Sequence, residues 1–220
     1  MRIAEFGFWI LLSVIGSYEN MQVKTRKQRF KELQSFANKG LNACVIEFAE
    51  KYLSDFPKSG IAWFIYYEAL NNLSKRKKAK LALQKAIEFV QNPEENLDWL
   101  YLQMGKLLED SGKFGEAIDW YEKASLQNPS EATFHIYRGL VYFHQEKYEK
   151  ADDILVEATK CSDGCIDEAF YKLGVVRMAK RDYQKAKICF EQSLEIDPKY
   201  KEAKQALKDV TQVLSMLEDK

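Results

Sequence analysis

The prolines of this chain recur at nearly regular intervals. Pro57, Pro93, Pro129 and Pro198 are separated by 36, 36 and 69 residues, that is, by one period, one period and nearly two. Proline lacks a backbone N–H and breaks helices, so it marks the boundaries of helical segments. Regular spacing of such boundaries indicates a chain built from repeated units.

Small residues recur in the same register, in pairs whose members are seven residues apart. The pairs are Ala79 with Ala86, Ala117 with Ala124, Ala151 with Ala158, and Ala186 with Ser193. Seven residues correspond to two turns of an α-helix, so both members of a pair lie on one helix face. A face of small side chains allows a neighbouring helix to approach closely. Each unit therefore contains a helix that packs tightly on a partner helix.

The segment before each pair of small residues also has helical spacing. Tyr101, Met104, Gly105 and Leu108 stand at i, i+3, i+4 and i+7, the pattern of one helix face. Equivalent faces occur around Tyr67, Gly139 and Gly174, and short turns follow them. Charged residues make up 30% of the chain, and glycine and proline together number only 14, a composition that favours helices. The sequence predicts an all-α fold in which each unit is a helix, a turn and a second helix.

A unit of about 34 residues with this pattern resembles the tetratricopeptide repeat. Residues 98–131 carry most of the residue types of that family, followed by residues 132–166 and 167–200. Residues 60–93 carry fewer of them, and residues 26–59 are similar to a degenerate repeat. The resemblance implies a right-handed α-solenoid of antiparallel helix pairs.

Four segments are expected along the chain. Residues 1–20 form a hydrophobic N-terminal helix or a signal or anchor segment, residues 21–59 the degenerate first repeat, residues 60–200 the main repeats, and residues 201–220 a capping helix. The last segment is amphipathic, as expected of a helix that ends a solenoid. Its apolar face consists of Ala203, Leu207, Val210, Leu214 and Leu217.

The N-terminal segment leaves three interpretations open. Phe6 to Ile15 is apolar except for Gly7 and Ser13, and it is shorter than the roughly 20 residues of a membrane span. Its length suits a buried first helix, the apolar region of a signal peptide or a membrane anchor. The four cysteines are too few for a disulfide framework and favour reduced thiols. We therefore expect a cytoplasmic protein, with a membrane-anchored or exported protein as the alternative if residues 1–16 are a signal segment.

The resemblance also implies a function, because stacked helix pairs leave a concave groove lined by the first helix of each pair. It places the lining one residue beyond the core positions. The predicted partner-binding residues are Phe64, Leu102, Ile136, Leu140, Phe143, Tyr171, Val175 and Met178. From Ile136 onward they form a stripe of large apolar side chains. The sequence therefore predicts a non-catalytic scaffold or adaptor that binds an apolar peptide or helix from a protein partner.

Other occupants of this groove remain open. The chain's own N-terminal or C-terminal segment is one, and a second copy in a homodimer is another; either describes a membrane-tethered or self-associating assembly factor. The family's best-known clamp uses Lys, Asn and Arg to hold the C-terminal carboxylate of a chaperone. This sequence has Phe64 and Glu68 where that clamp would begin, so the resemblance does not extend to that specificity.

The net charge of zero conceals an asymmetry. Residues 19–90 carry 14 Lys/Arg against 7 Asp/Glu, whereas residues 91–220 carry 18 against 25. Two basic clusters, residues 24–31 and 75–80, suit nucleic-acid phosphates. The first cluster follows Phe6 to Ile15 in the sequence and would also suit an anionic membrane. Both clusters lack interleaved aromatic side chains that would stack on bases, so RNA binding is disfavoured.

Catalysis and metal binding receive little support from the sequence. It contains no phosphate-binding glycine loop, no nucleophile elbow and no His-Glu metal spacing. His135 replaces an aromatic residue on a helix face, which indicates packing. Cys161 and Cys165 flank a short turn without a second ligand pair nearby in the sequence. We expect no enzyme activity, no cofactor and no metal site.

Overall fold

A computed structural model describes residues 25–90 and 97–218. This part of the chain consists of helices and the turns that connect them, which confirms the all-α repeat fold. Residues 1–24, including Phe6 to Ile15, lie outside the described residues, so the interpretations of the N-terminal segment stay predictions. The helices are α2 (Arg26–Asn38), α3 (Asn42–Asp55), α4 (Gly60–Asn72), α5 (Arg76–Glu88), α6 (Leu97–Glu109), α7 (Phe114–Gln127), α8 (Ala132–His144), α9 (Tyr148–Ala158), α10 (Ile166–Ala179), α11 (Tyr183–Ile196) and α12 (Lys201–Glu218).

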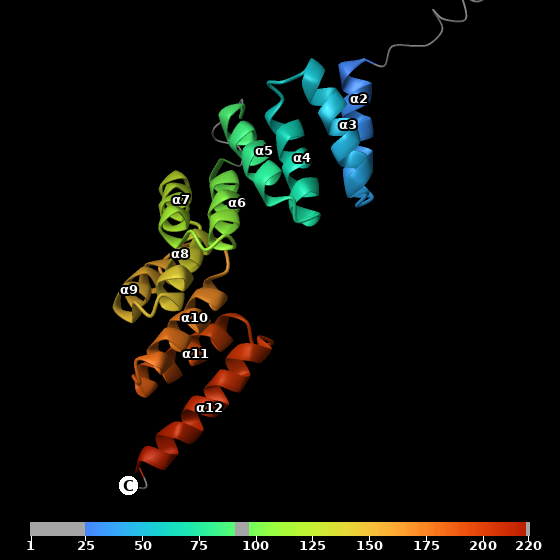
Figure 1. Ribbon diagram of the computed structural model, residues 1–220. Helices are drawn as coiled ribbons and strands as arrows, with labels where there is room; N and C mark the ends of the chain where they lie inside the picture. The colour runs from blue at the N-terminus through green and yellow to red at the C-terminus, as the bar shows by residue number, and fades with distance from the viewer. Residues whose placement is uncertain (1–24, 91–96, 219–220) are drawn as a thin grey trace, which may run out of the picture.

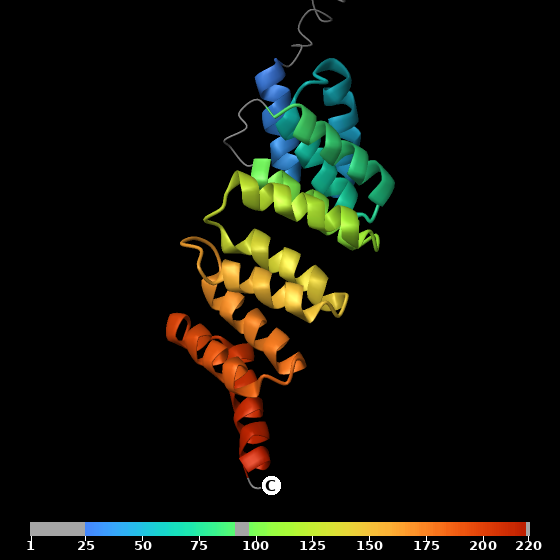
Figure 2. The ribbon, with the colours of Figure 1, turned by 90° about the vertical axis from the view of Figure 1, so that its left-hand side faces the viewer.

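The helices stack in pairs along a curved solenoid. Figure 1 shows α4, α6 and α8 toward the inner side of the curve, with α5, α7 and α9 toward its outer side. Figure 2 shows the successive pairs stacked one above another, and α12 at the end of the stack. The predicted solenoid of helix pairs is therefore present, and residues 26–55 form a helix pair at its first end.

One turn geometry joins the two helices of every pair. In each turn a single residue adopts a positive φ, and the next residue donates its N–H to the carbonyl five residues before it. These left-handed residues are Gly40, Ser74, Gly112, Glu146 and Arg181. This bonding pattern is the Schellman C-cap, which satisfies the last carbonyls of a helix. A residue with a side chain adopts this conformation at some cost, so three of the five turns are strained by their sequence.

Close approach between the helices of a pair depends on a missing side chain. A Cβ added to Gly105 would collide with the ring of Tyr121, and one added to Gly139 would lie 2.8 Å from Cγ of Leu155. Gly174 faces Phe190 in the same way. The glycine face predicted from the sequence is thus the contact between the two helices in the pairs α6–α7, α8–α9 and α10–α11.

The helix α12 continues the repeat positions of the earlier first helices, but no second helix packs on it within the described residues. Ala203 and Val210 of the expected apolar face are fully buried against the last pair, whereas Leu217 at its far end is 51% exposed. Lys208 occupies the position that corresponds to Gly174 one unit earlier, and it is exposed. A long charged side chain there prevents another helix from approaching as α11 approaches α10. Helix α12 therefore closes the stack of described helices.

The free energy of unfolding should depend on the close contact at Gly105. We expect Gly105→Ala to lower the free energy of unfolding by about 1–3 kcal/mol, because the buried Tyr121 ring has no room for an added methyl group. The hydroxyl of Tyr121 also donates to Glu109 at 2.7 Å, which holds the ring in place. The matched control is Gly115→Ala in α7, where an added Cβ meets nothing within 4 Å. Urea unfolding followed by circular dichroism measures both, and equal midpoints would contradict this account.

Candidate functional site

The predicted groove residues all belong to the first helices of their pairs, and α4, α6 and α8 lie toward the inner side of the solenoid (Figure 1). They are Phe64 in α4, Leu102 in α6, Ile136, Leu140 and Phe143 in α8, and Tyr171, Val175 and Met178 in α10. Six of them are partly exposed, but the exposed fractions of Leu102 and Ile136 are only 0% and 3%. The prediction is corrected for these two residues, because core side chains offer no surface to a partner.

The inner face at α6 and α8 is formed instead by the next residue along each helix. Gln103 accepts a hydrogen bond from the Tyr67 hydroxyl at 3.4 Å, which joins α6 to α4. Lys106 donates to the hydroxyl of Tyr137 at 3.3 Å and lies 4.9 Å from the centre of its ring, which joins α6 to α8. Gln103 and Tyr137 were not predicted, because one residue turns a helical side chain by about 100° and the sequence period does not fix this angle.

A polar network continues from Lys106 along the inner face. Glu109 accepts the hydrogen bond from Tyr121, and its other oxygen lies 3.7 Å from Nδ1 of the exposed His144. Lys106, Glu109 and His144 thus bring groups of both charges into the region between α6 and α8. This region can hydrogen-bond to the backbone of an extended or helical peptide.

The region between α8 and α10 is apolar. Leu140 and Phe143 pack against the buried cluster that α8, α9 and α10 share. Tyr171, Val175 and Met178 pack against a second cluster formed by α10, α11 and α12. All five side chains stay partly exposed. We call these five residues the apolar stripe.

Burial changes the electrostatics at the first end of the inner face. Desolvation raises the pKa of Tyr67 to about 12, with smaller contributions from the carboxylates of Glu68 and Asp110. Desolvation also raises the pKa of Glu68. Tyr67 therefore remains a neutral phenol at physiological pH and keeps its proton for Gln103.

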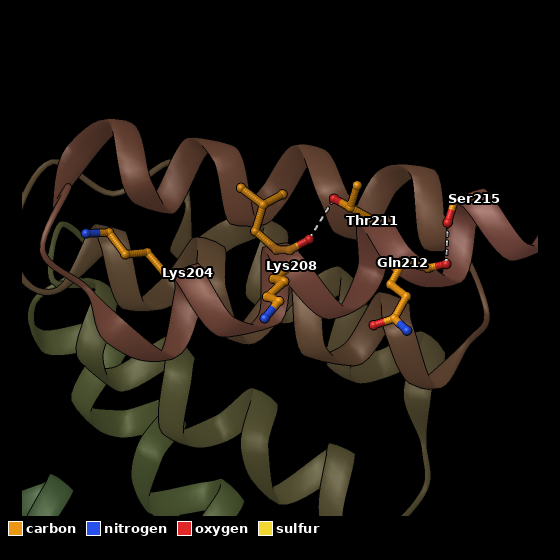
Figure 3. Close-up of a pocket in the computed structure, with 6 residues that line it drawn as sticks. Lys204, Lys208, Thr211, Gln212 and Ser215 are labelled. Atoms are coloured by element: carbon orange, nitrogen blue, oxygen red, sulfur yellow. Dashed lines mark hydrogen bonds between the residues drawn. The ribbon is translucent and has the colours of Figure 1, made fainter.

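A shallow hollow lies on α12 and is lined by that helix alone. Figure 3 shows its polar side chains, among them Lys204, Lys208 and Gln212. The hydroxyl of Thr211 donates to the carbonyl of Leu207 at 2.7 Å, and Ser215 likewise bonds to its own helix. In register with the earlier pairs, this is the face on which a second helix would pack. Leu207 and the aliphatic parts of the polar side chains also line it, so the hollow is an exposed helix face of mixed polarity.

The residues considered for catalysis or metal binding take other positions. Nδ1 of His135 is buried 3.7 Å from a carboxylate oxygen of Glu157, and burial, followed by the charge of Arg138, lowers the pKa of this histidine. His135 is thus a packed neutral side chain. The four cysteines are free thiols. Within residues 25–90 and 97–218 no three His, Cys, Asp or Glu side chains are grouped to hold a metal, and no helix there is both long and apolar enough to cross a membrane.

Comparison with known families agrees with this geometry. Two family models described as tetratricopeptide repeat match the chain, one over residues 102–160 and the other over residues 167–200. The solved structure of YrrB, described as a TPR protein, aligns with a TM-score of 0.63 over 90% of this chain and 97% of that chain, at 16% identity. This chain is a tetratricopeptide-repeat protein. Proteins built from these repeats are generally non-catalytic scaffolds, and this one is a protein-interaction scaffold.

Two human proteins show sequence similarity to these tetratricopeptide repeats. Sperm-associated antigen 1 is 29% identical over 103 residues, which are 47% of this chain and 11% of that protein. RNA polymerase II-associated protein 3 is 29% identical over 108 residues, which are 49% of this chain and 16% of that protein. The chain thus matches only a small part of each relative. Their similarity concerns the repeats.

Leu102 is fully buried and Leu140 is partly exposed, so truncating each to alanine should lower the free energy of unfolding by different amounts. We expect Leu102→Ala to lower the free energy of unfolding by about 2–5 kcal/mol, because the fully buried side chain leaves a cavity. Leu140→Ala should cost clearly less, since Leu140 is only partly buried. Thermal unfolding of the two variants tests the assignment. A larger loss for Leu140 would mean that the core and surface positions have been exchanged.

Proposed function

We propose that this scaffold binds an apolar peptide or amphipathic helix along the apolar stripe of Leu140, Phe143, Tyr171, Val175 and Met178. The observation that supports it is a set of large apolar side chains, all partly exposed, on two neighbouring first helices of a solenoid. Partly exposed apolar side chains on consecutive helices gain free energy when a partner removes them from water. An amphipathic helix offers the matching i, i+3, i+4, i+7 face.

Polar groups beside the stripe would orient the ligand. Lys106 lies in α6 and His144 at the end of α8. In α10, Lys172 pairs with Glu168 at 3.5 Å. These groups can hydrogen-bond to peptide carbonyls and N–H groups while the apolar side chains of the ligand cover the stripe. YrrB is described as having an unusual peptide-binding site, and our proposal gives this chain a peptide site of its own composition.

The last helix limits where a peptide can lie. Tyr171, Val175 and Met178 share a packing cluster with Val210 of α12, so one flank of the stripe is already covered. A ligand would therefore enter from the α6 side and lie between α8 and α10. This arrangement leaves the end of the solenoid closed while the centre of the inner face stays accessible.

Charge on the stripe should abolish binding. A phage-displayed peptide library selected on the full chain supplies a ligand, and fluorescence anisotropy gives its affinity. We expect Leu140→Asp with Val175→Asp to weaken this affinity at least about a hundredfold, because two carboxylates would be desolvated in an apolar contact. Circular dichroism should show unchanged helicity. The alanine pair at the same positions is expected to weaken binding by a smaller factor, and it serves if the aspartates reduce helicity.

A matched control carries the same charges elsewhere. Leu126→Asp with Ile188→Asp changes two exposed apolar residues on α7 and α11, the second helices of their pairs. This variant should bind the selected peptide as the wild-type chain does. Equal binding by the stripe variant and the control would refute the proposal. Sedimentation velocity tests whether a second copy of the chain occupies the stripe instead. A dimer that dissociates in the stripe variant would assign the stripe to that second copy.

A further inference from the structure

The turns of the first two helix pairs lie side by side at one edge of the solenoid (Figure 1). Asn72, at the end of α4, donates a hydrogen bond to the side-chain oxygen of Asn42 in α3 at 3.3 Å. Arg76 in the second turn donates to the carbonyl of Asp110 in the next pair at 3.0 Å. These bonds hold the successive turns in one row. We call the part made by residues 39–41 and 73–77 the turn edge.

The turn edge exposes two leucines. Leu41 and Leu73 are each 44% exposed, and each stands beside the left-handed residue of its turn, Gly40 or Ser74. The two leucines stand at different positions of the same turn geometry, since Leu41 follows the left-handed residue and Leu73 precedes it. Each still leaves a large part of its side chain in water, and contact with another apolar phase would remove that area.

Lysines surround these leucines at the turn edge. Lys39, Lys75 and Lys77 are exposed, and they form no ion pair within the part of the chain that the structure describes. Neither residues 38–46 nor residues 69–87 contain an acidic residue. The turn edge is therefore both cationic and apolar.

Nearby carboxylates are already engaged with other lysines. Glu47 pairs with Lys51 at 2.7 Å, and Glu50 lies 3.5 Å from Lys78. Glu50 also accepts a hydrogen bond from the hydroxyl of Tyr66 at 2.7 Å. The hydrogen bond from Tyr66, followed by Lys78 and to a smaller extent Lys75, lowers the pKa of Glu50. Lys39 and Lys77 have no carboxylate partner within the described residues and keep their charge for a partner outside the chain.

The chemistry of the turn edge favours a membrane surface over a nucleic acid. Anionic lipid headgroups attract lysines, and aliphatic side chains insert at the boundary with the acyl chains. Single-stranded nucleic acid needs aromatic platforms for its bases, and the strongly exposed large apolar side chains of residues 25–90 are all aliphatic. The sequence also carries the apolar run Phe6 to Ile15 upstream, and stable membrane attachment generally requires two such signals.

We propose that the turn edge docks on an anionic lipid bilayer, with Leu41 and Leu73 inserted at the interface and Lys39, Lys75 and Lys77 on the lipid phosphates. This surface shares no residue with the apolar stripe. A docked chain would therefore keep its inner face available to a peptide.

Vesicle co-sedimentation of the full chain tests this docking. The probes are vesicles of phosphatidylcholine, with and without phosphatidylserine. We expect binding that depends on phosphatidylserine and falls with added salt. Lys39→Glu with Lys75→Glu and Lys77→Glu should reduce the partition coefficient at least about tenfold, since each lysine near an anionic surface contributes about a fivefold factor. Leu41→Ser with Leu73→Ser should also weaken binding severalfold, because the inserted apolar area is lost.

Matched controls distinguish vesicle binding by the turn edge from binding by charge at other surfaces and from binding by the apolar run Phe6 to Ile15. The variant Lys160→Glu with Lys199→Glu and Lys201→Glu makes the same charge change on exposed lysines at the other end of the chain and should bind vesicles nearly as wild type. Equal binding of all variants, or binding independent of phosphatidylserine, overturns the proposal. Tighter binding to single-stranded RNA that needs the lysines but not the leucines overturns it too. Peptide affinity at the apolar stripe should not change, so the two proposals fail independently.

Discussion

The close approach of two helices through a glycine is the constraint on which the repeats depend. Gly105, Gly139 and Gly174 each leave a space that one large side chain of the second helix fills. Such contact fixes both the distance between the helices and their rotation about their own axes, because a buried ring has few alternative positions. The first pair reverses the sizes, with Leu33 and Ala49 at the corresponding positions, both fully buried. The second pair has Tyr67 and Leu83 at these positions, both buried, so one small residue per contact describes the other four pairs.

The same contact determines what the inner face presents. The residue after each glycine points away from the second helix, and these residues are Lys106, Leu140 and Val175, all partly exposed. Their counterpart in α4 is Glu68, which follows Tyr67. The position thus changes from charged to apolar along the solenoid, although the backbone repeats. Packing sets the geometry of the inner face, whereas single residues next to the packing position set its chemistry.

This division explains how far the sequence could predict the structure. Prolines, small residues and glycines are constrained by packing, so their spacing predicted the helix pairs and the close contacts. The left-handed turn residues Glu146 and Arg181 could not be predicted, because the hydrogen bonds of the turn override their local preference. The same limit applied to Leu102 and Ile136. Their burial depends on the rotation of α6 and α8 within the stack, and a period of 34 residues does not specify an angle.

The charge asymmetry of the chain has a structural role at the junctions of α5 with the pairs on either side. Lys78 lies 3.5 Å from Glu50 of the first pair. Lys80 lies 3.6 Å from Glu116, and Arg76 reaches the carbonyl of Asp110, so the basic α5 contacts the third pair through opposite charges and dipoles. Exposed ion pairs of this kind each contribute about 0–1 kcal/mol, too little to explain the whole excess of lysine. Lys39 and Lys77 form no ion pair within the described residues, and Lys75 acts on Glu50 only as a minor cause of its lowered pKa. The exposed lysines of the turn edge lie beside the exposed leucines Leu41 and Leu73. Both kinds of side chain are suited to contact with an anionic bilayer.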